Sequence, residues 1–258
     1  MLTKTDGDSS ERIRLAAQRL ANARRAGISL KEMLQDCRPA SMCDALEIQD
    51  LATELLGEKV CGWKVFTPPA GELARGGILG SLFFEDGAQI DPTVAPFLGI
   101  EAEIAFRLEA DIPQRSKPYS RNDVAPLVSA CPAIEIIHSR YIDFNVVTLH
   151  ERVADHFLNG GFVCGRTTRD WSSLDLAKAH LTLEINDIVV IEAIGGHPAG
   201  DPVLPVVDLA NHFRTGQGLK AGQVVTTGSF SGLACVRPGQ SIRATFNGLG
   251  SVAAHIKG

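Results

Sequence analysis

The chain has 258 residues, of which 45% are hydrophobic and 21% charged, and its formal net charge is −5 at pH 7. A chain of this length and composition can bury a sizeable core, either as one large domain or as a domain with an appendage. The acidic balance argues against a general nucleic-acid or anionic-membrane binder, because such a protein would carry a basic surplus.

Neither a membrane span nor a secretion signal is indicated. No apolar run approaches the roughly 18 residues of a membrane span, and the N-terminal stretch MLTKTDGDSSERIR lacks the apolar core of a signal peptide. The six cysteines contain no C-x-x-C pair, so buried, reduced thiols are favoured over a zinc knuckle or a disulfide framework. We therefore expect a soluble cytoplasmic protein without nucleic-acid or membrane partners.

Residues 1–58 are expected to form a helical N-terminal segment that packs on the rest of the chain, because two apolar stripes with helical spacing occur here. Serine residues can cap the start of each helix, and a glycine can end it. The acidic residues fall mostly opposite the apolar stripes, so this segment should contribute no metal ligand. The start and end signals are Ser9, Ser10 and Gly27 for the first helix, and Ser41, Asp44 and Gly57 for the second.

Residues 59–258 are expected to form a β-rich catalytic domain, because short β-rich runs recur between Gly, Pro, Asn and Asp residues. Asn186 and Asp187 have the composition of a tight hairpin turn between two of these runs. Since strands do not alternate with helices, a doubly wound βαβ sheet is disfavoured. The expected helices follow Ser120 or Asn122 and span about 206–215, and the expected strands are KVCGWKVF (59–66), GIEAEIAFRL (99–108), AIEII (133–137), LTLEI (181–185), IVVIEA (188–193), QVVTTG (223–228), LACVRP (233–238) and SIRATF (241–246).

The stretch LGIEAEIAFRL, residues 98–108, places two glutamates on one face of a strand. Because side chains alternate along a strand, Glu101 and Glu103 point the same way, roughly 7 Å apart along it. Like charges this close need water, a cation or a shared proton. Polar residues on the wet face of an ordinary antiparallel strand would have the same pattern.

Glu135 lies in PAIEIIHSR, a run that is apolar on both faces. A lone carboxylate in a buried strand costs free energy unless it is paired or bound to a cation, although an edge position or an arginine partner would also explain it. Three carboxylates on two strands, with no His or Cys set at ligand spacing, suit an oxygen-seeking ion such as Mg²⁺ or Mn²⁺. We therefore predict Glu101, Glu103 and Glu135 as metal ligands.

Three further groups are candidates for chemistry. Lys64 in CGWKVF would exchange protons near neutrality if its apolar neighbours lower its pKa, although a solvated strand lysine fits the same pattern. Asp155 and His156 are candidates for an acid and a base, but adjacent residues rarely face the same way. The hydroxyls and the glycine of TTGS (226–229) suit a carboxylate cradle, and equally a turn of small residues. No G-x-S-x-G elbow is present, which disfavours acyl-enzyme chemistry.

These stretches, in this order, resemble the fumarylacetoacetate hydrolase superfamily, in particular its branch of 2-keto-4-pentenoate hydratases and 4-oxalocrotonate decarboxylases. The resemblance implies an α+β fold, namely a mixed β-roll or sandwich with a helical N-terminal segment. It also implies a Mg²⁺ or Mn²⁺ site and homo-oligomers built from dimers. It covers most of the chain and is carried by GWKV (62–65), GIEAEIAFRL (99–108), PAIEIIHSR (132–140), VADHFLNGGFVCG (153–165), GDPVLPVVDLANHF (200–213), GLKAGQVVTTGS (218–229) and FNGLGSV (246–252).

The resemblance also assigns roles to residues. The metal-binding carboxylates of the family fall on the three glutamates already predicted, and its strand lysine, proposed to handle protons, falls on Lys64. Family contacts with the substrate carboxylate fall near the T-G-S run. Together with the candidates above, the predicted catalytic residues are Lys64, Asp155 and His156, and the predicted substrate contacts are Thr227, Ser229 and Asn159.

The sequence departs from the family pattern at positions that are expected to line the pocket. Ile78 stands where characterised hydratases tend to have an aspartate just before a Phe-Gly step, and His138 stands in place of the aspartate of a D-S-R step. The family's usual A-D-N-A-S run reads ADHFLN (154–159) here. These departures bear on the substrate and the reaction more than on the fold or the metal.

The function implied is metal-dependent hydration of a 2-hydroxypenta-2,4-dienoate-type acid, a small 2-oxo-acid substrate of aromatic catabolism. Decarboxylation of an oxalocrotonate and C–C hydrolysis of an acylpyruvate or fumarylacetoacetate-type acid pass through a similar enolate. A non-catalytic 2-oxo-acid binding protein on the same scaffold is a further alternative, because of the pocket departures. The sequence leaves these alternatives open.

Overall fold

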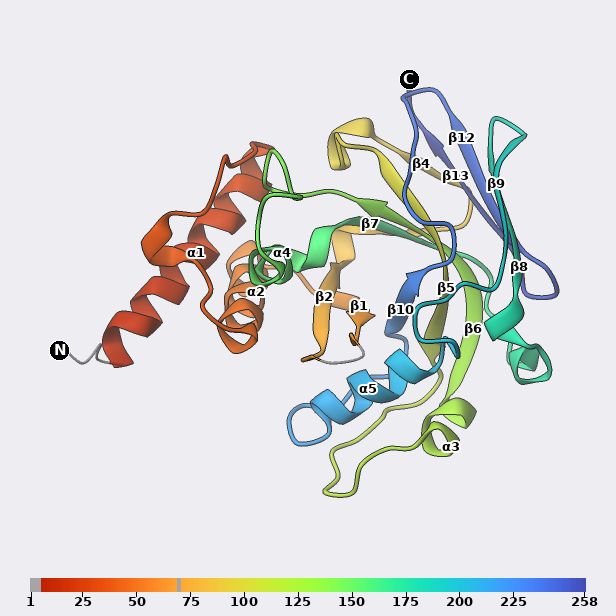
Figure 1. Cartoon of the computed structure of the whole chain (residues 1–258), viewed down its shortest axis with the longest axis horizontal. Coiled ribbons are helices and arrows are strands. Elements are labelled where there is room, and N and C mark those ends of the chain that lie inside the picture. The colour runs from red at the N-terminus through yellow and green to blue at the C-terminus, as the bar shows by residue number, and fades with distance from the viewer. Residues whose placement is uncertain (1–5, 69–70) are drawn as a thin grey trace.

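The computed structural model describes residues 6–68 and 71–258 (Figure 1). Within these residues, two β-sheets pack together as a curled body, and helices cover its ends. The helices are α1 (Asp6–Ala26), α2 (Met42–Leu56), α3 (Arg121–Val124), α4 (Leu149–Ala154) and α5 (Leu204–Phe213). No helix in this part of the chain is long and apolar enough to cross a membrane. The α+β class expected from the sequence is confirmed.

The larger sheet has the strand order β2-β1-β10-β5-β6-β7-β3, with β11 paired to β5. The smaller sheet has the order β4-β13-β12-β8-β9. The strands are β1 (Val60–Phe66), β2 (Ala74–Leu79), β3 (Phe83–Glu85), β4 (Ala88–Ile90), β5 (Gly99–Leu108), β6 (Val128–Ile137), β7 (Asn159–Cys164), β8 (His180–Ile185), β9 (Ile188–Ile194), β10 (Val224–Ser229), β11 (Ala234–Cys235), β12 (Ser241–Phe246) and β13 (Gly250–Ile256).

The main core lies between the two sheets and fixes the orientation of β5. Ile100, Ile104 and Phe106 are fully buried in this core together with side chains of β8, β12 and β13. Because strand side chains alternate, the odd-numbered residues of β5 must face the other side of the larger sheet. Burial of the apolar face therefore directs the glutamates of β5 away from the main core.

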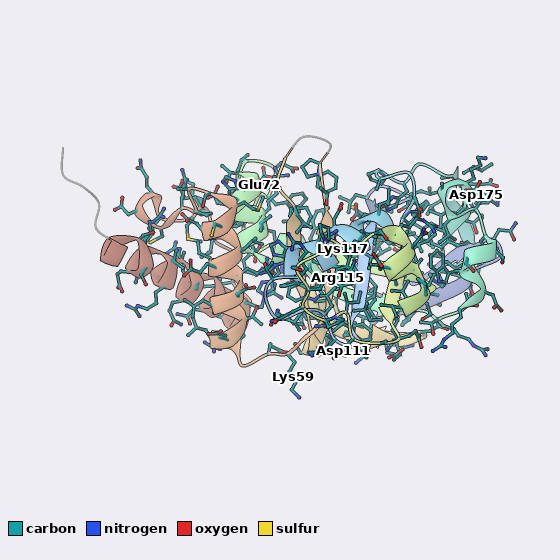
Figure 2. The ribbon with its side chains drawn as sticks, turned by 90° about the horizontal axis from the view of Figure 1, so that it is seen from below. Lys59, Glu72, Asp111, Arg115, Lys117 and Asp175 are labelled. Atoms are coloured by element: carbon teal, nitrogen blue, oxygen red, sulfur yellow. The ribbon has the colours of Figure 1, made fainter. Side chains whose placement is uncertain are left out.

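Helices α1 and α2 form a second core with α4 and the edge strand β2, to the left in Figure 1. Gln49 of α2 lies at this junction, where its amide donates to the Arg75 carbonyl at 2.9 Å and accepts from the Gly77 N–H at 3.0 Å. The boundary predicted after residue 58 falls in the turn between α2 and β1. Charged side chains such as Lys59 project from the outside of the molecule (Figure 2).

The predicted ends of α2 are confirmed. The Ser41 hydroxyl accepts a hydrogen bond from the Asp44 N–H at 3.1 Å, and Gly57 ends the helix with a φ of 72°. The predicted start of α1 is wrong, because the helix begins at Asp6 and Ser9 lies inside it. Aspartate is as favourable as serine near the start of a helix, so the sequence DGDSS does not mark Ser9 as the first position.

Strand β9 is an edge strand with apolar side chains in solvent. Ile188 is 67% exposed and Ile194 is 75% exposed. Asn186 and Asp187 join β9 to β8 with φ values of 52° and 61°, as expected for a tight hairpin turn. Because an apolar edge is typical of a surface that meets another chain, β9 is consistent with the predicted homo-oligomer, which stays a prediction.

Candidate active site

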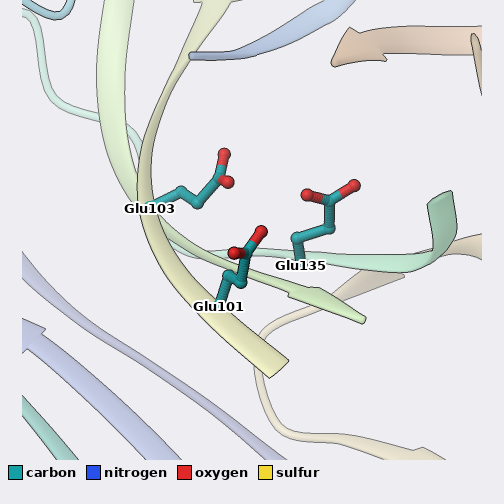
Figure 3. A group of neighbouring side chains, drawn as sticks. All are labelled: Glu101, Glu103 and Glu135. Carbon is teal, nitrogen blue, oxygen red and sulfur yellow. The ribbon is translucent and has the colours of Figure 1, made fainter. Parts of the chain in front are cut away.

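Strands β5 and β6 bring the three predicted glutamates together (Figure 3). Glu101 and Glu135 are directly opposite each other in the register of the two strands, and Glu103 lies two residues further along β5. One carboxylate oxygen from each residue lies within 4.8 Å of the others. The Glu103 and Glu135 side chains are fully buried, whereas the Glu101 side chain is 20% exposed.

Lys64 of β1 completes this cluster. Its ammonium nitrogen Nζ lies 2.7 Å from Glu135 Oε2 and 3.9 Å from Glu101 Oε2. The Lys64 side chain is only 12% exposed, so the interpretation of Lys64 as a solvated strand lysine is wrong. The expected lowering of its pKa is also wrong in this structure. Burial does lower the pKa of Lys64, but the attraction of Glu135, Glu101 and Glu103 outweighs burial and raises it.

The carboxylates are not fully compensated by the protein. Burial, together with the charges of Glu135 and Glu101, raises the pKa of Glu103 to about 8. Burial likewise raises the pKa of Glu135. Glu103 Oε1 is buried and has no hydrogen-bond partner among residues 6–68 and 71–258. Three converging carboxylates with an unpartnered buried oxygen fit a hard divalent cation, which takes oxygen ligands.

Two polar side chains orient these carboxylates. The Thr226 hydroxyl and the Gly228 N–H, at 3.3 Å, donate to Glu103 Oε2. The Asn159 side-chain amide donates to Glu135 Oε1 at 2.9 Å, which places this predicted residue at the cluster. Thr226 belongs to the TTGS run that the sequence singled out, but it was not among the predicted site residues. The only signal for it is strand alternation, and that signal requires knowing which side of β10 faces Glu103.

Two predicted substrate contacts lie in other environments. The Thr227 hydroxyl donates to the Ile104 carbonyl at 3.1 Å, because Thr227 follows Thr226 on β10 and faces the opposite side of the sheet. The structure therefore does not bring Thr227 to the glutamates. Ser229 pairs with Glu103 in the strand register, and its hydroxyl lies 3.3 Å from the Ser231 hydroxyl. A substrate contact at Ser229 stays a prediction.

Asp155 and His156 make structural contacts. Asp155 Oδ1 accepts from Arg140 Nε at 2.5 Å, in a buried ion pair. The His156 Nε2 atom lies 3.0 Å from the Thr53 hydroxyl of α2. Burial first, and then nearby arginines, holds the pKa of His156 well below its usual value. Neither side chain makes a hydrogen bond or an ion pair with the glutamates among the described residues, so an acid–base role for them remains a prediction without structural support.

The turn before Asn159 has an unusual backbone. His156, Phe157 and Leu158 all have left-handed φ values, 53°, 51° and 66°, although none is glycine. Such residues cost free energy and persist only where the surroundings fix them. Gly76 on β2 allows the turn to approach, since a Cβ there would lie 2.3 Å from the His156 carbonyl oxygen. The turn places the Phe157 ring centroid 5.2 Å from Lys64 Nζ.

The other departures from the family pattern lie on two sides of the site. Ile78 of β2 is fully buried, and it pairs with Gly62 two residues before Lys64 on β1. It therefore shares the face of the sheet that carries Lys64 and belongs to a small apolar cluster with Ala105. His138 lies beyond the end of β6 and is half-buried. Burial first, and then Arg140, lowers the pKa of His138 to about 4, so the ring is neutral at physiological pH.

We expect the contribution of Glu103 to the stability of the metal-free protein to be lost as the pH rises from 4.5 to about 8. Folded Glu103 keeps its proton up to about pH 8, whereas an unfolded glutamate loses it near 4.5. At this residue the folded state therefore binds more protons in this window, so its contribution to the free energy of unfolding falls with pH. Histidines with a lowered pKa, such as His138 and His156, act in the opposite direction below about pH 6.5, so the effect is read as the difference between wild type and Glu103→Gln in EDTA. The wild type should lose stability relative to the variant as the pH rises, and a difference in melting temperature that does not change with pH would contradict this.

Comparison with known proteins places the chain among enzymes of similar length. No protein-family model matches it. The 2-keto-4-pentenoate hydratase of Paraburkholderia xenovorans (strain LB400) is 29% identical over 249 residues, which cover 92% of each chain. A structure of 4-oxalocrotonate decarboxylase from Pseudomonas putida G7, complexed with magnesium and adipate, gives a TM-score of 0.84 at 26% identity over 99% of this chain and 100% of that chain. Fumarylacetoacetate hydrolase from Exiguobacterium antarcticum shares the fold, with a TM-score of 0.56 at 15% identity over 76% and 74% of the two chains.

Proposed function

Since the chain belongs to the fumarylacetoacetate hydrolase superfamily, together with 2-keto-4-pentenoate hydratases and 4-oxalocrotonate decarboxylase, we propose that it is a metal-dependent hydratase of 2-hydroxypenta-2,4-dienoate-type acids. The observation that carries the proposal is the cluster of three glutamates next to a buried lysine. Acidic ligands, a proton-transfer group and apolar walls are the components that this reaction requires.

The metal would be held by Glu101, Glu103 and Glu135, and Mg²⁺ or Mn²⁺ matches their oxygen chemistry. When bound, the ion supplies positive charge that stabilises negative charge developing on the oxygens of the 2-oxo acid. Thr226 and Asn159 hold two of the carboxylates in their orientations. These contacts fix the ligand set without adding charge to it.

Lys64 is the proposed proton-transfer residue. Hydration adds the elements of water across a carbon–carbon double bond, so one carbon gains a proton and its neighbour gains a hydroxyl. The Lys64 ammonium is buried beside the ligand set and can give a proton to a substrate carbon held there. The Phe157 ring lies against Lys64 and restricts the access of water to the ammonium.

The apolar side chains near Lys64 favour a hydratase over a decarboxylase. The Phe157 ring lies beside Lys64, and the fully buried Ile78, on the same face of the sheet, puts hydrocarbon in place of the aspartate expected from the family pattern. A dienoate with an uncharged end suits such walls, whereas burying the second carboxylate of an oxalocrotonate against them costs free energy. Decarboxylation is the second candidate, supported by the similarity to 4-oxalocrotonate decarboxylase over nearly the whole chain.

Turnover by the purified protein with Mg²⁺ tests the proposal. With 2-hydroxypenta-2,4-dienoate, we expect the dienoate absorbance to disappear and 4-hydroxy-2-oxopentanoate to form. Release of CO₂ from 4-oxalocrotonate without hydration would identify the decarboxylase, and two acids from an acylpyruvate would identify a hydrolase. Tight oxalate binding without turnover of any of these acids would show a binding protein instead.

A further inference from the structure

A cavity of about 330 Å³ lies between the C-terminal ends of α1 and α2 and the turn that follows β2. None of the three glutamates lines it, and neither does Lys64. Its wall combines positive charge with hydrocarbon. The charged residues are Arg24, Arg25, Arg140 and Glu58, and the apolar ones include Ile28, Leu56, Leu79, Leu82 and Val94.

Arg24 lines this cavity without a carboxylate at ion-pair distance among the described side chains. Its guanidinium donates one hydrogen bond, to the Asn159 carbonyl at 3.3 Å. Burial, together with the nearby Arg140, lowers the pKa of Arg24 to about 9, against the attraction of Asp155 and Glu58, which lie beyond ion-pair distance. A half-buried cation in this environment is stabilised by an anion that enters the cavity and pairs with it directly.

The other charged groups of the cavity leave it with a single net positive charge. Arg140 is neutralised by Asp155, at 2.5 Å. Arg25 donates to the Leu55 carbonyl at the exposed rim, and Glu58 accepts a hydrogen bond from the Ser81 N–H at 3.3 Å. Because Glu58 offsets one of the two arginines that lack an ion pair within the described residues, Arg24 and Arg25, the wall matches a ligand with one negative charge and a short apolar chain. A phosphate dianion would bring more charge than this wall neutralises.

We propose that this cavity is a binding site for a small monocarboxylate, whose carboxylate pairs with Arg24 and whose chain packs on Ile28 and Leu82. The proposal does not rest on the proposed hydratase activity, because the cavity shares no ligand with the glutamate cluster. Charge-assisted hydrogen bonds of the guanidinium give the affinity, and the apolar wall selects an organic acid over an inorganic anion.

Titration of the metal-free protein with sodium butyrate tests this site, at constant ionic strength, by calorimetry and by thermal melting. Without metal, the glutamate cluster repels a carboxylate, so any butyrate that binds is expected to occupy the cavity. We expect saturable binding and a rise in melting temperature. Arg24→Gln should weaken butyrate binding about tenfold or more, whereas Arg14→Gln, on the exposed side of the same helix, should leave it unchanged.

The unliganded Arg24→Gln protein should melt cooperatively and close to the wild type, because Arg24 makes no ion pair and one long hydrogen bond with the described part of the chain; such a melt confirms that the variant is folded. Absence of saturable butyrate binding to the wild type would overturn the proposal. So would equal binding by wild type and Arg24→Gln, or binding of inorganic phosphate in preference to butyrate. Loss of oligomeric mass in Arg24→Gln without butyrate binding would show that a second copy of the chain covers the cavity, which also overturns it.

Discussion

Replacing Lys64 with methionine should slow hydration of 2-hydroxypenta-2,4-dienoate by about 10²- to 10⁴-fold, the usual contribution of a positioned acid–base group. Methionine keeps the buried hydrocarbon chain but cannot carry a proton. The affinity for Mg²⁺ should not fall, because Lys64 is no ligand and its positive charge opposes a cation beside Glu135. Hydration rates and calorimetric titrations with Mg²⁺, measured on the same preparation, would separate the loss of rate from any change in metal affinity.

The pH dependence of the rate distinguishes proton transfer from a structural role. Because the glutamates raise the pKa of Lys64, its limb lies on the alkaline side of the profile, and the Lys64→Met profile should lack it. Because Glu135 loses its buried partner, the variant should be assayed at saturating Mg²⁺ and its fold checked by circular dichroism. Lys59→Met, at an exposed position near the start of the same strand, is the matched control. A rate within a few-fold of wild type with an unchanged profile would assign the proton transfer to another group.

Replacing Glu103 with glutamine should lower the affinity for Mg²⁺ or Mn²⁺ well over tenfold, because it removes one of three anionic ligands. The glutamine oxygen can still accept the hydrogen bonds from Thr226 and Gly228. Its amide would take the position of the unpartnered Glu103 Oε1. Calorimetric titration of the metal into wild type and variant would measure the loss.

The same substitution should not destabilise the metal-free protein. Because the pKa of Glu103 is raised to about 8, glutamine resembles the neutral form that the folded state already favours at pH 7. The melting temperature in EDTA should therefore stay the same or rise while metal affinity falls. Glu47→Gln, on the exposed face of α2, should change neither quantity. Unchanged metal affinity in Glu103→Gln would remove this residue from the ligand set.

Local signals in the sequence predicted much of the fold. The cap at Ser41, the glycine at Gly57 and the turn at Asn186–Asp187 are set by contacts within a few residues, and the structure confirms them. The alternation of side chains along β5 predicted that Glu101 and Glu103 share a face. The opposite face carries only apolar residues in the sequence, which indicates that it is buried.

The features that could not be predicted from the sequence depend on contacts between distant segments of the chain. Strands β2 and β7 contain adjacent glycines, which weaken the alternating pattern, so neither was predicted. The choice between Thr226 and Thr227 requires the register of β10 against β5. The partner of Asp155 is an arginine beyond the end of β6, and no spacing rule connects the two.

Asn159 contacts both the glutamate cluster and Arg24 of the cavity proposed to bind a carboxylate. Its side-chain amide donates to Glu135, and its backbone carbonyl accepts from Arg24 at 3.3 Å and from Arg140 at 3.5 Å. If the cavity binds a carboxylate as proposed, its pairing with Arg24 would change the bonding of the residue that orients Glu135. Thermodynamic reciprocity would then require that the factor by which butyrate changes Mg²⁺ affinity equals the factor by which Mg²⁺ changes butyrate affinity. Occupancy of either site would then depend on the concentration of both ligands.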